Sequence, residues 1–378
     1  MNNSDNKILK EIAVLSMRLG VITFGGPAAY IAIMQKEIVK KLNWLSDQQF
    51  LDLFSIANLI PGPTSTEMSI LIGNEKAGWK GLIIAGLCFI LPAVLITGIF
   101  AVFYKDYGQL PQLQPFIYGI KPSIIVIILA AVYPLGKKSL KTIVLGIISS
   151  ITLILCLFGV NVIYVMFGAG FIALAIEFIR IKKSDSAKSV FPYSLIKLTG
   201  TGILGAGNLG IFLTFLKIGA VLYGSGYLLF AFLDSELVAK GIISRQLLMD
   251  SIAVGQFTPG PVFSSVTFIG YQINGLTGAT VSTIGIFLSS FIFVALLSPL
   301  VKKMRNSILF SVFLNAVNVA SVAIIVAICY QIGKEAIVDW RTILIAIASL
   351  FFAFRFRKIN NALIIIGGSA LGYLLHFV

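Results

Sequence analysis

The chain has 378 residues, of which 58% are hydrophobic and only 12% are charged. A soluble domain has about half apolar and about a quarter charged residues, so this composition, with a mean hydropathy of +0.98, indicates an integral membrane protein. The formal net charge is +14, but the basic residues collect in short loops between apolar segments. That pattern is typical of membrane orientation and excludes nucleic acid as the expected partner.

Twelve apolar segments follow one another, six on each side of a basic linker. They run over 9–35, 47–73, 79–104, 116–135, 142–160 and 162–180, and then over 205–234, 244–273, 276–301, 308–331, 341–354 and 359–377. Most have nearly the ~20 residues that a spanning helix needs, although Gly and Pro interrupt the first two of each half. The sequence predicts an all-α polytopic membrane protein with two transmembrane domains, 1–195 and 196–378.

The two halves are copies of each other. Adding 199 carries Arg18 to Lys217 and Gly25 to Gly224, and adding 198 carries Asp52 to Asp250, Asn58 to Gln256 and Pro61-Gly62-Pro63 to Pro259-Gly260-Pro261. A later shift of 197 pairs Gly73 with Gly270, Gly78 with Gly275 and Gly81 with Gly278. Chance similarity of two apolar segments would match Leu and Ile rather than these residues, so we infer an internal repeat.

The segments 47–73 and 244–273 are broken at their PGP motifs. The break in 47–73 leaves pieces of roughly 13 and 10 residues, each too short to span alone. This predicts a re-entrant helix–turn–helix, with two short tilted spans as the alternative.

Charge then predicts the orientation. Six loops, at 36–41, 76–80, 137–141, 180–197, 302–305 and 355–358, hold 19 of the 29 Lys and Arg residues. With the PGP segments re-entrant, all six loops fall on the cytoplasmic side. Each half then crosses five times, which places the N-terminus outside and predicts two inverted-topology repeats, the plan of secondary transporters.

Breaks within a bilayer are tolerated only inside protein or beside a polar cavity. After each PGP the chain restarts as a helix, whose free N–H groups and positive dipole end form an anion site. Thr64 and Ser65 add hydroxyls there, and the glycines of the breaks let a ligand approach the backbone. Close helix packing is the alternative explanation for glycines elsewhere in the spans.

Cations accompany the glycine breaks. Arg18 and Lys217 each stand seven residues before a glycine, Gly25 or Gly224, and so share its helix face. Lys121, beside Pro122, is a third candidate. Cations within a span indicate function and here an anionic substrate, although each could instead extend to the membrane surface. Asp52 and Asp250 either form polar helix faces or pair with Arg18 and Lys217. Glu67 aligns with Ser265, which argues against a proton role for it.

Cysteine and histidine are too scarce for a catalytic or metal centre. Cys88, Cys156 and Cys329 stand singly in apolar runs, and His376 is the one histidine of the chain. We therefore expect no metal, no cofactor and no enzyme activity. The sequence holds no G-x-x-x-x-G-K-[ST] loop, so energy from ATP would require another subunit.

These stretches resemble the chromate ion transporter superfamily. The resemblance rests on F-G-G-P-A-A-Y (24–30), W-L-S-D-Q-Q-F-L-D-L (44–53), A-N-L-I-P-G-P-T-S-T-E (57–67) and A-G-W-K-G (77–81), and on Y-G-S-G-Y (223–227), V-G-Q-F-T-P-G-P-V-F (254–263) and T-F-I-G-Y (267–271). It implies a long-chain, two-domain member in the bacterial cytoplasmic membrane, with chromate efflux and resistance as its role and sulfate as an alternative ligand. Tyr30 stands where the family often has His, and Ile243 where Trp is common.

We therefore expect a secondary transporter that exports chromate. A transporter of sulfate or another oxyanion is the first alternative, and a membrane enzyme or scaffold acting on lipid headgroups is an alternative of another class. A homodimer stays open. The candidate substrate-binding residues are Arg18, Gly25, Gly26, Pro27, Asn58, Pro61, Gly62, Pro63, Thr64, Ser65, Lys121, Lys217, Gly224, Ser225, Gln256, Pro259, Gly260 and Pro261, and the candidates for coupling or ion pairing are Asp52, Glu67 and Asp250.

Overall fold

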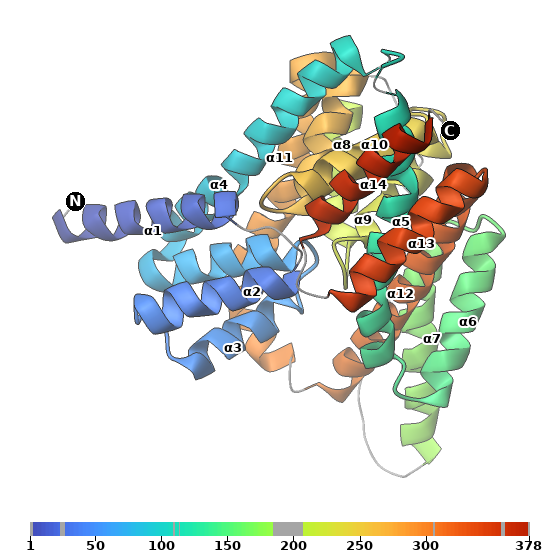
Figure 1. The fold of residues 1–378 in the computed structure, drawn as a ribbon. Coiled ribbons are helices and arrows are strands. Elements are labelled where there is room, and N and C mark those ends of the chain that lie inside the picture. The colour runs from blue at the N-terminus through green and yellow to red at the C-terminus, as the bar shows by residue number, and fades with distance from the viewer. Residues whose placement is uncertain are drawn as a thin grey trace.

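The fold of this chain is seen in a computed structural model, which describes residues 3–22, 27–108, 110–112, 114–183, 207–304, 307–356 and 360–376. The described residues form helices joined by turns, as predicted (Figure 1). Five of the helices within them are long and apolar enough to cross a membrane. The chain is therefore an all-α, multi-pass membrane protein.

Both halves contain their helices in the same order. The first half has α1 (Asn3–Ile22), α2 (Pro27–Gln35), the π-helical turn η1 (Lys36–Lys41), α3 (Asp47–Ala57), α4 (Thr64–Tyr107), α5 (Gln114–Ser139), α6 (Ile143–Leu157) and α7 (Val162–Lys183). The second has α8 (Asn208–Val221), α9 (Leu228–Leu233), the π-helical turn η2 (Asp234–Val238), α10 (Arg245–Phe257), the 3-10 turn η3 (Val262–Ser264), α11 (Ser265–Met304), α12 (Ile308–Ala336), α13 (Trp340–Arg355) and α14 (Asn361–His376).

The helices α4 and α11 are each folded into a hairpin. Non-helical backbone interrupts α4 at Ala77 and Gly78, and it interrupts α11 at Asn274 and Gly275, with φ +58° and +57° at the two glycines. A side chain is strained at such positive φ values. Below, the short arm of α4 is 64–76 and its long arm is 79–107, whereas the short arm of α11 is 265–273 and its long arm is 276–304. Glycines let the arms touch, because Gly73 packs on Gly81 and Gly270 packs on Gly278.

The first PGP segment begins and ends at one level of the molecule. Trp44 lies just before α3, and Lys76 ends the short arm of α4. The Lys76 ammonium is 3.4 Å from the Trp44 carbonyl oxygen and 5.5 Å from the centre of its ring. In the second half, Tyr104 contacts both α10 and the short arm of α11, through Asp250 (2.5 Å) and Phe268 (5.0 Å between ring centres). Both contacts favour a helix–turn–helix over two tilted spans.

The first apolar segment also folds back, so the prediction that 9–35 crosses the membrane once is wrong. The helix α1 runs parallel to the long arm of α4, since Ser16 lies beside Ser69, which in turn bonds the Ala85 carbonyl, and Gly20 packs on Phe89. The chain then returns, with Tyr30 against Phe89 and Trp44 beside Lys76. Hydropathy cannot distinguish a span from a hairpin of the same length.

This reversal removes the crossing count on which the expected external position of the N-terminus depended. The amino end of α1 lies at the same end of the α4 long arm as the loops 36–46 and 76–80. Lys7 and Lys10 therefore join the other basic residues, and they no longer contradict the charge distribution. The predicted count of five crossings per half included 9–35 as a span, so it no longer supports inverted repeats, and that arrangement rests instead on the directions of the helices.

The two long arms run in opposite directions. Gln272, just before the turn of α11, donates to the carbonyl of Ala101 near the end of α4 (2.8 Å). Farther along the long arm of α11, the ring of Phe291 packs on Gly86, near the start of the long arm of α4. The long arms of α4 and α11 are therefore antiparallel, which can be followed in Figure 1.

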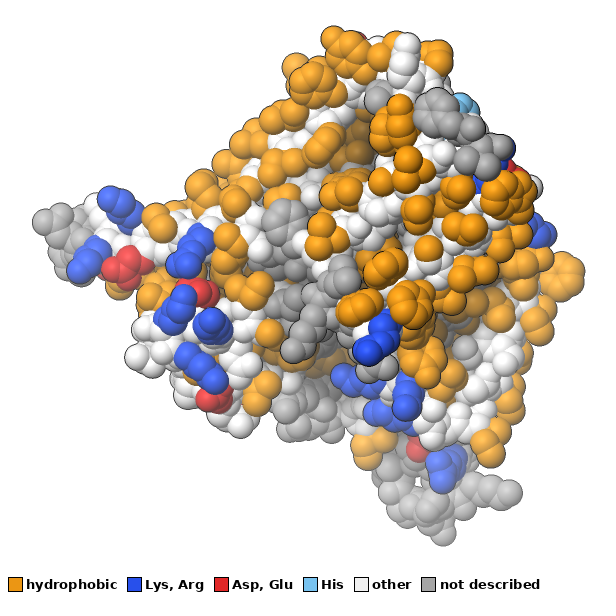
Figure 2. All heavy atoms as spheres, viewed as in Figure 1, with side chains coloured by type: hydrophobic (Ala, Val, Ile, Leu, Met, Phe, Trp, Pro, Cys, Tyr) orange, Lys and Arg blue, Asp and Glu red, His pale blue; other side chains and the backbone are white. Residues whose placement is uncertain are grey.

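Apolar side chains cover the outside of the molecule as well as its core. Leu87, Leu91, Leu95 and Ile99 form a stripe at four-residue spacing on the α4 long arm, and each is 45–57% exposed. Figure 2 shows this apolar surface in orange, with Lys and Arg gathered at the left end and along the lower edge. A wide apolar exterior between basic edges fits a lipid environment.

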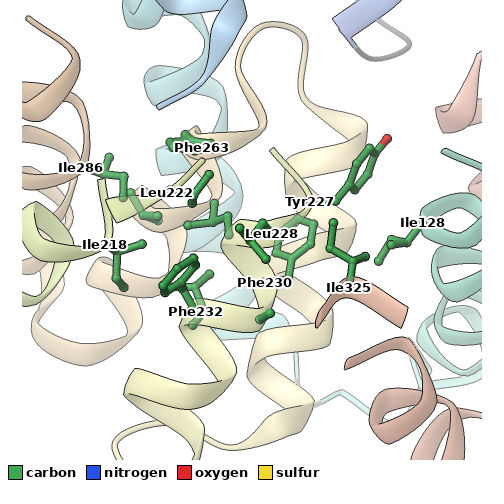
Figure 3. Packing of buried hydrophobic residues seen from close by; sticks show 14 of the residues in the cluster. Ile128, Ile218, Leu222, Tyr227, Leu228, Phe230, Phe232, Phe263, Ile286 and Ile325 are labelled. Carbon is green, nitrogen blue, oxygen red and sulfur yellow. The ribbon is translucent and has the colours of Figure 1, made fainter. Parts of the chain in front are cut away.

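The core centres on α9, whose six residues from Leu228 to Leu233 are all buried. Figure 3 shows this helix between Phe263 and Leu222 on one side and Ile325 and Ile128 on the other. A short helix that is apolar all round belongs inside a protein. Its burial holds the second glycine break, at 222–227, next to α12.

Candidate functional site

The first PGP break connects α3 to the short arm of α4 and contacts the second half of the chain. Gly62 has a φ of +135°, and its N–H donates to the carbonyl of Leu222, just after α8 (2.8 Å). A methyl group at Gly62 would lie 2.6 Å from the hydroxyl of Ser290 in α11 and would also meet the Glu67 carboxyl. Pro63 caps α4 without a side-chain hydrogen bond, so the helix N-terminus faces the break.

The second PGP break connects α10 to α11 and contacts the first half. Gly260 has a φ of +94°, and a methyl group there would lie 3.0 Å from Ala93 Cβ and 3.1 Å from the carbonyl oxygen of Gly20. The shift of 197 carries Ala93 to Ser290, so the two breaks make equivalent contacts in the opposite half. Both breaks therefore lie where the two repeats contact each other.

Unpaired polar atoms collect around these two breaks. In the described part of the chain, the buried side-chain atoms without a hydrogen-bond partner are Tyr30 Oη, Thr66 Oγ1, both carboxyl oxygens of Glu67, Gln256 Nε2 and the hydroxyls of Ser264, Ser265 and Ser290. All but Tyr30 lie within five residues of a PGP or contact one. A buried polar group without a partner is costly and needs an explanation. A polar ligand between the breaks would provide one.

The predicted break residues differ in how they use their side chains. Asn58 is exposed, and its amide donates to the Phe54 carbonyl of its own helix (2.8 Å), whereas its counterpart Gln256 is buried with its amide nitrogen unpaired. Thr64 and Ser65 are partly buried in the first turn of α4. The prolines of both breaks are buried: Pro61, Pro63, Pro259 and Pro261.

Of the GGP motif, Gly25 and Gly26 lie outside the described residues, and Pro27 begins α2. Its counterpart in the second half is described. Gly224 has a φ of +97° and faces Asn318 of α12, while Ser225 accepts the N–H of Tyr227 (3.4 Å). Asn318 is the repeat equivalent of Lys121, so the position aligned with this predicted cation lies against a glycine break.

The predicted cations have carboxylate partners that the sequence analysis missed. Arg18 contacts Glu37 (3.5 Å), which also bonds Lys41 (2.6 Å). Lys217 contacts Glu236 (2.7 Å), which also bonds Lys240 (2.6 Å). The shift of 199 that links Arg18 to Lys217 also links Glu37 to Glu236 and Lys41 to Lys240, so the repeat itself could have revealed both clusters. The side chains of Arg18 and Lys217 are 55% and 42% exposed.

The ion pairs described for Arg18 and Lys217 are formed with glutamates and not with Asp52 or Asp250. Asp250 accepts from Tyr104 (2.5 Å) and from Gln246 (3.0 Å), and Lys121 acts on it electrostatically. Asp52 accepts from Gln48 on its own helix (3.2 Å). The partners of Arg18 and Lys217 come instead from the π-helical turns η1 and η2.

Comparison with known proteins agrees with this arrangement. The Chromate transporter family model matches residues 10–174 and again residues 209–373, one copy in each half. A probable chromate transport protein of Synechococcus elongatus is 28% identical over 95% of this chain and 93% of its own length. The chromate transport protein of Cupriavidus metallidurans is also 28% identical, over 96% of this chain and 92% of its own length.

An uncharacterised transporter of Methanocaldococcus jannaschii is 28% identical over 99% of this chain and 96% of its own length. No solved structure matches the chain. The family is one of transporters and not of enzymes. The repeated match covers most of the sequence, so this multi-pass membrane protein belongs to the chromate transporter family.

Proposed function

We propose that the protein is a secondary transporter that exports chromate across the bacterial cytoplasmic membrane. The observation that carries this proposal is the collection of unpaired buried polar atoms at two helix breaks, each packed against the opposite half. Backbone N–H groups, hydroxyls and the amide of Gln256 are hydrogen-bond donors that a tetrahedral oxyanion accepts from. Membership of the family supports chromate as the anion.

We further propose that the halves are inverted repeats and that the PGP and GGP segments are re-entrant. The antiparallel long arms and the shared level of Trp44 and Lys76 support this plan. Because the inside of the cell is negative, the membrane potential favours export of a dianion by ~2.3 kcal/mol per charge per 100 mV. The membrane potential could therefore drive chromate export without ATP.

Arg18, Lys217 and Lys121 belong to this proposal as cations that attract the dianion towards the breaks. Their carboxylate neighbours leave each cluster around Arg18 and Lys217 with a net positive charge, because two cations share one glutamate in each. Sulfate is the second candidate substrate, since a site of helix ends and hydroxyls discriminates poorly between two tetrahedral dianions. Whether two copies associate does not affect this site, which one chain completes.

The test is chromate and sulfate flux into liposomes containing the purified protein. We expect chromate flux, and inhibition by excess sulfate. Ser265→Ala should reduce the flux by about tenfold, the cost of one lost hydrogen bond to a charged ligand. Ser150→Ala is the matched control, since Ser150 is exposed on α6 and bonds its own helix. Equal flux with and without protein would refute the proposal.

The orientation is tested separately by labelling single cysteines in a chain without its three native ones. Lys240→Cys should react with an impermeant reagent in intact cells, whereas Lys7→Cys should react only after the membrane is opened. Reaction of both from the same side would contradict the inverted plan.

A further inference from the structure

Glu67 is a buried carboxyl group to which the oxyanion site assigns no role. It is the fourth residue of α4, and it is 0% exposed. Neither carboxyl oxygen has a hydrogen-bond partner in the described part of the chain, and no ion pair described there includes it. Its repeat equivalent is Ser265, so only one of the two PGP breaks carries a carboxyl group.

The surroundings of Glu67 favour the neutral acid. Burying an unpaired carboxylate costs far more than the nearby helix N-terminus can recover, because the dipole of a helix end acts as about half a charge. Tyr223, beside the glycine break after α8, is an ionisable group close enough to Glu67 to interact with it electrostatically. A phenol adds no positive charge that would stabilise a carboxylate.

Four ionisable side chains on helices packed against α4 have other described neighbours. Arg18 of α1 pairs with Glu37, Asp52 of α3 accepts from Gln48, Asp250 of α10 accepts from Tyr104, and Tyr30 of α2 packs on Phe89. None of these described contacts brings a cation to Glu67. The carboxyl group thus stays neutral for want of a counter-charge.

Glu67 also occupies the place proposed for the anion. A methyl group at Gly62 would meet both the Glu67 carboxyl and Ser290 Oγ, so both groups lie beside the glycine of the first break. A carboxylate and a dianion repel strongly at such short range in a medium of low dielectric constant. A neutral carboxylic acid, in contrast, can donate a hydrogen bond to an oxyanion.

We propose that Glu67 is a proton-binding site that must be protonated for the oxyanion to bind at the first break. The inference rests on the proposed oxyanion function. It adds that protonation of Glu67 and binding of the anion favour each other. Because linkage is reciprocal, the proton strengthens anion binding and the anion strengthens proton binding. At a pH where the free protein holds Glu67 as a carboxylate, Glu67 takes up one proton as the dianion binds and releases it when the dianion leaves; at a lower pH, where Glu67 is already protonated, binding takes up no proton.

The first measurement needs no substrate. Infrared spectra of the purified protein at neutral pH should contain the C=O band of a buried protonated carboxyl group, and Glu67→Gln should remove it. Glu75→Gln is the matched control, because Glu75 is exposed on the same short arm. A wild-type spectrum without the band, or a band that survives in Glu67→Gln, would overturn the protonated state.

The second measurement is chromate binding between pH 7.5 and 9.5, where chromate stays a dianion. Wild-type affinity should fall with pH, by up to about tenfold per pH unit once Glu67 loses its proton, since one proton is linked to one anion. Glu67→Gln imitates the neutral acid, so it should bind with an affinity that does not change with pH. A slope that persists in Glu67→Gln would overturn the coupling.

Proton uptake by the wild-type protein keeps the proposal testable if Glu67→Gln fails to fold. Adding chromate at pH 9 in weakly buffered solution should withdraw up to one proton per bound anion. Binding without proton uptake, at a pH at which the free protein has lost the infrared band of Glu67, would overturn the coupling and leave the oxyanion function intact. Complete absence of chromate binding, with the infrared band present, would overturn the proposed function and leave only the protonated carboxyl group.

Discussion

The two PGP breaks share a backbone but differ in the polar groups around them. Gly62 and Gly260 both have positive φ, and both contact the opposite half. The first break adds a carboxyl group at Glu67 and a hydroxyl at Ser290, where the second has Ser265 and Ala93. The repeat therefore preserves the geometry that exposes helix ends, while its divergence has left the ionisable group in one copy. The backbone of a break and the ionisable group beside it can therefore be changed separately by mutation.

The largest expected difference between the breaks is at their glycines. Gly62→Ala should lower the free energy of unfolding by about 2–5 kcal/mol, from positive φ and overpacking together, because its methyl group meets Glu67 and Ser290. Gly260→Ala meets only atoms at 3.0 Å or more, so we expect about half that loss. Thermal unfolding of both variants in detergent measures the difference, and equal losses would mean that the breaks are packed alike.

The hairpin turns should behave as a matched pair. Gly73 packs on Gly81 and Ala85, and Gly270 packs on Gly278 and Ser282. A methyl group at either glycine forces the two arms apart, which costs about 1–3 kcal/mol. Gly73→Ala and Gly270→Ala should therefore lower the unfolding temperature by similar amounts. Gly168→Ala, where a methyl group meets open space, is the control for a helical glycine.

The ion clusters should differ by less. Glu236 has a side chain that is 3% exposed and makes bonds of 2.7 and 2.6 Å, whereas Glu37 is 9% exposed and one of its contacts is 3.5 Å. Removing a buried partner costs up to about 3–5 kcal/mol, and the partial exposure of the lysines reduces this. We expect about 1–3 kcal/mol for Glu236→Gln and less for Glu37→Gln in chemical unfolding. The reverse order would show that Arg18 depends on its glutamate more than Lys217 does.

The smallest expected difference concerns two equivalent helix caps, Thr142 before α6 and Asp339 before α13. Asp339 accepts from the N–H of Thr342 (2.9 Å) and from Tyr118, while Thr142 accepts from Leu145 (3.3 Å). Replacing either by Ala should cost about 1 kcal/mol at neutral pH, with Asp339 the costlier.

Acid should remove the difference between the caps. The hydrogen bond from Tyr118, followed by that from Thr342, holds the pKa of Asp339 below its ordinary value. A lowered folded-state pKa stabilises the protein above the unfolded pKa, near 4, and this contribution is lost as the pH falls through the folded pKa. The Asp339→Ala penalty should therefore shrink in acid while that of Thr142→Ala stays constant.

The repeat and its breaks could be predicted from the sequence because Gly, Pro and charged residues recur at fixed shifts. The hairpin in 9–35 could not, since a broken helix pair and a single span have the same hydropathy. The partners of Arg18 and Lys217 required the fold, although the shift of 199 also links Glu37 to Glu236. The repeat argues against a role for Glu67, because its equivalent is Ser265, whereas the burial of its carboxyl group is visible in the structure alone.

The hydrogen bond from Gly62 to Leu222 has a consequence for biogenesis. Its donor is synthesised 160 residues before its acceptor, and Ser290 follows later still. A ribosome that has finished the first half thus leaves a lipid-embedded backbone turn with an unpaired N–H. The first half alone therefore lacks the acceptor for this N–H, and we expect it to reach its final structure only after the second half has been inserted.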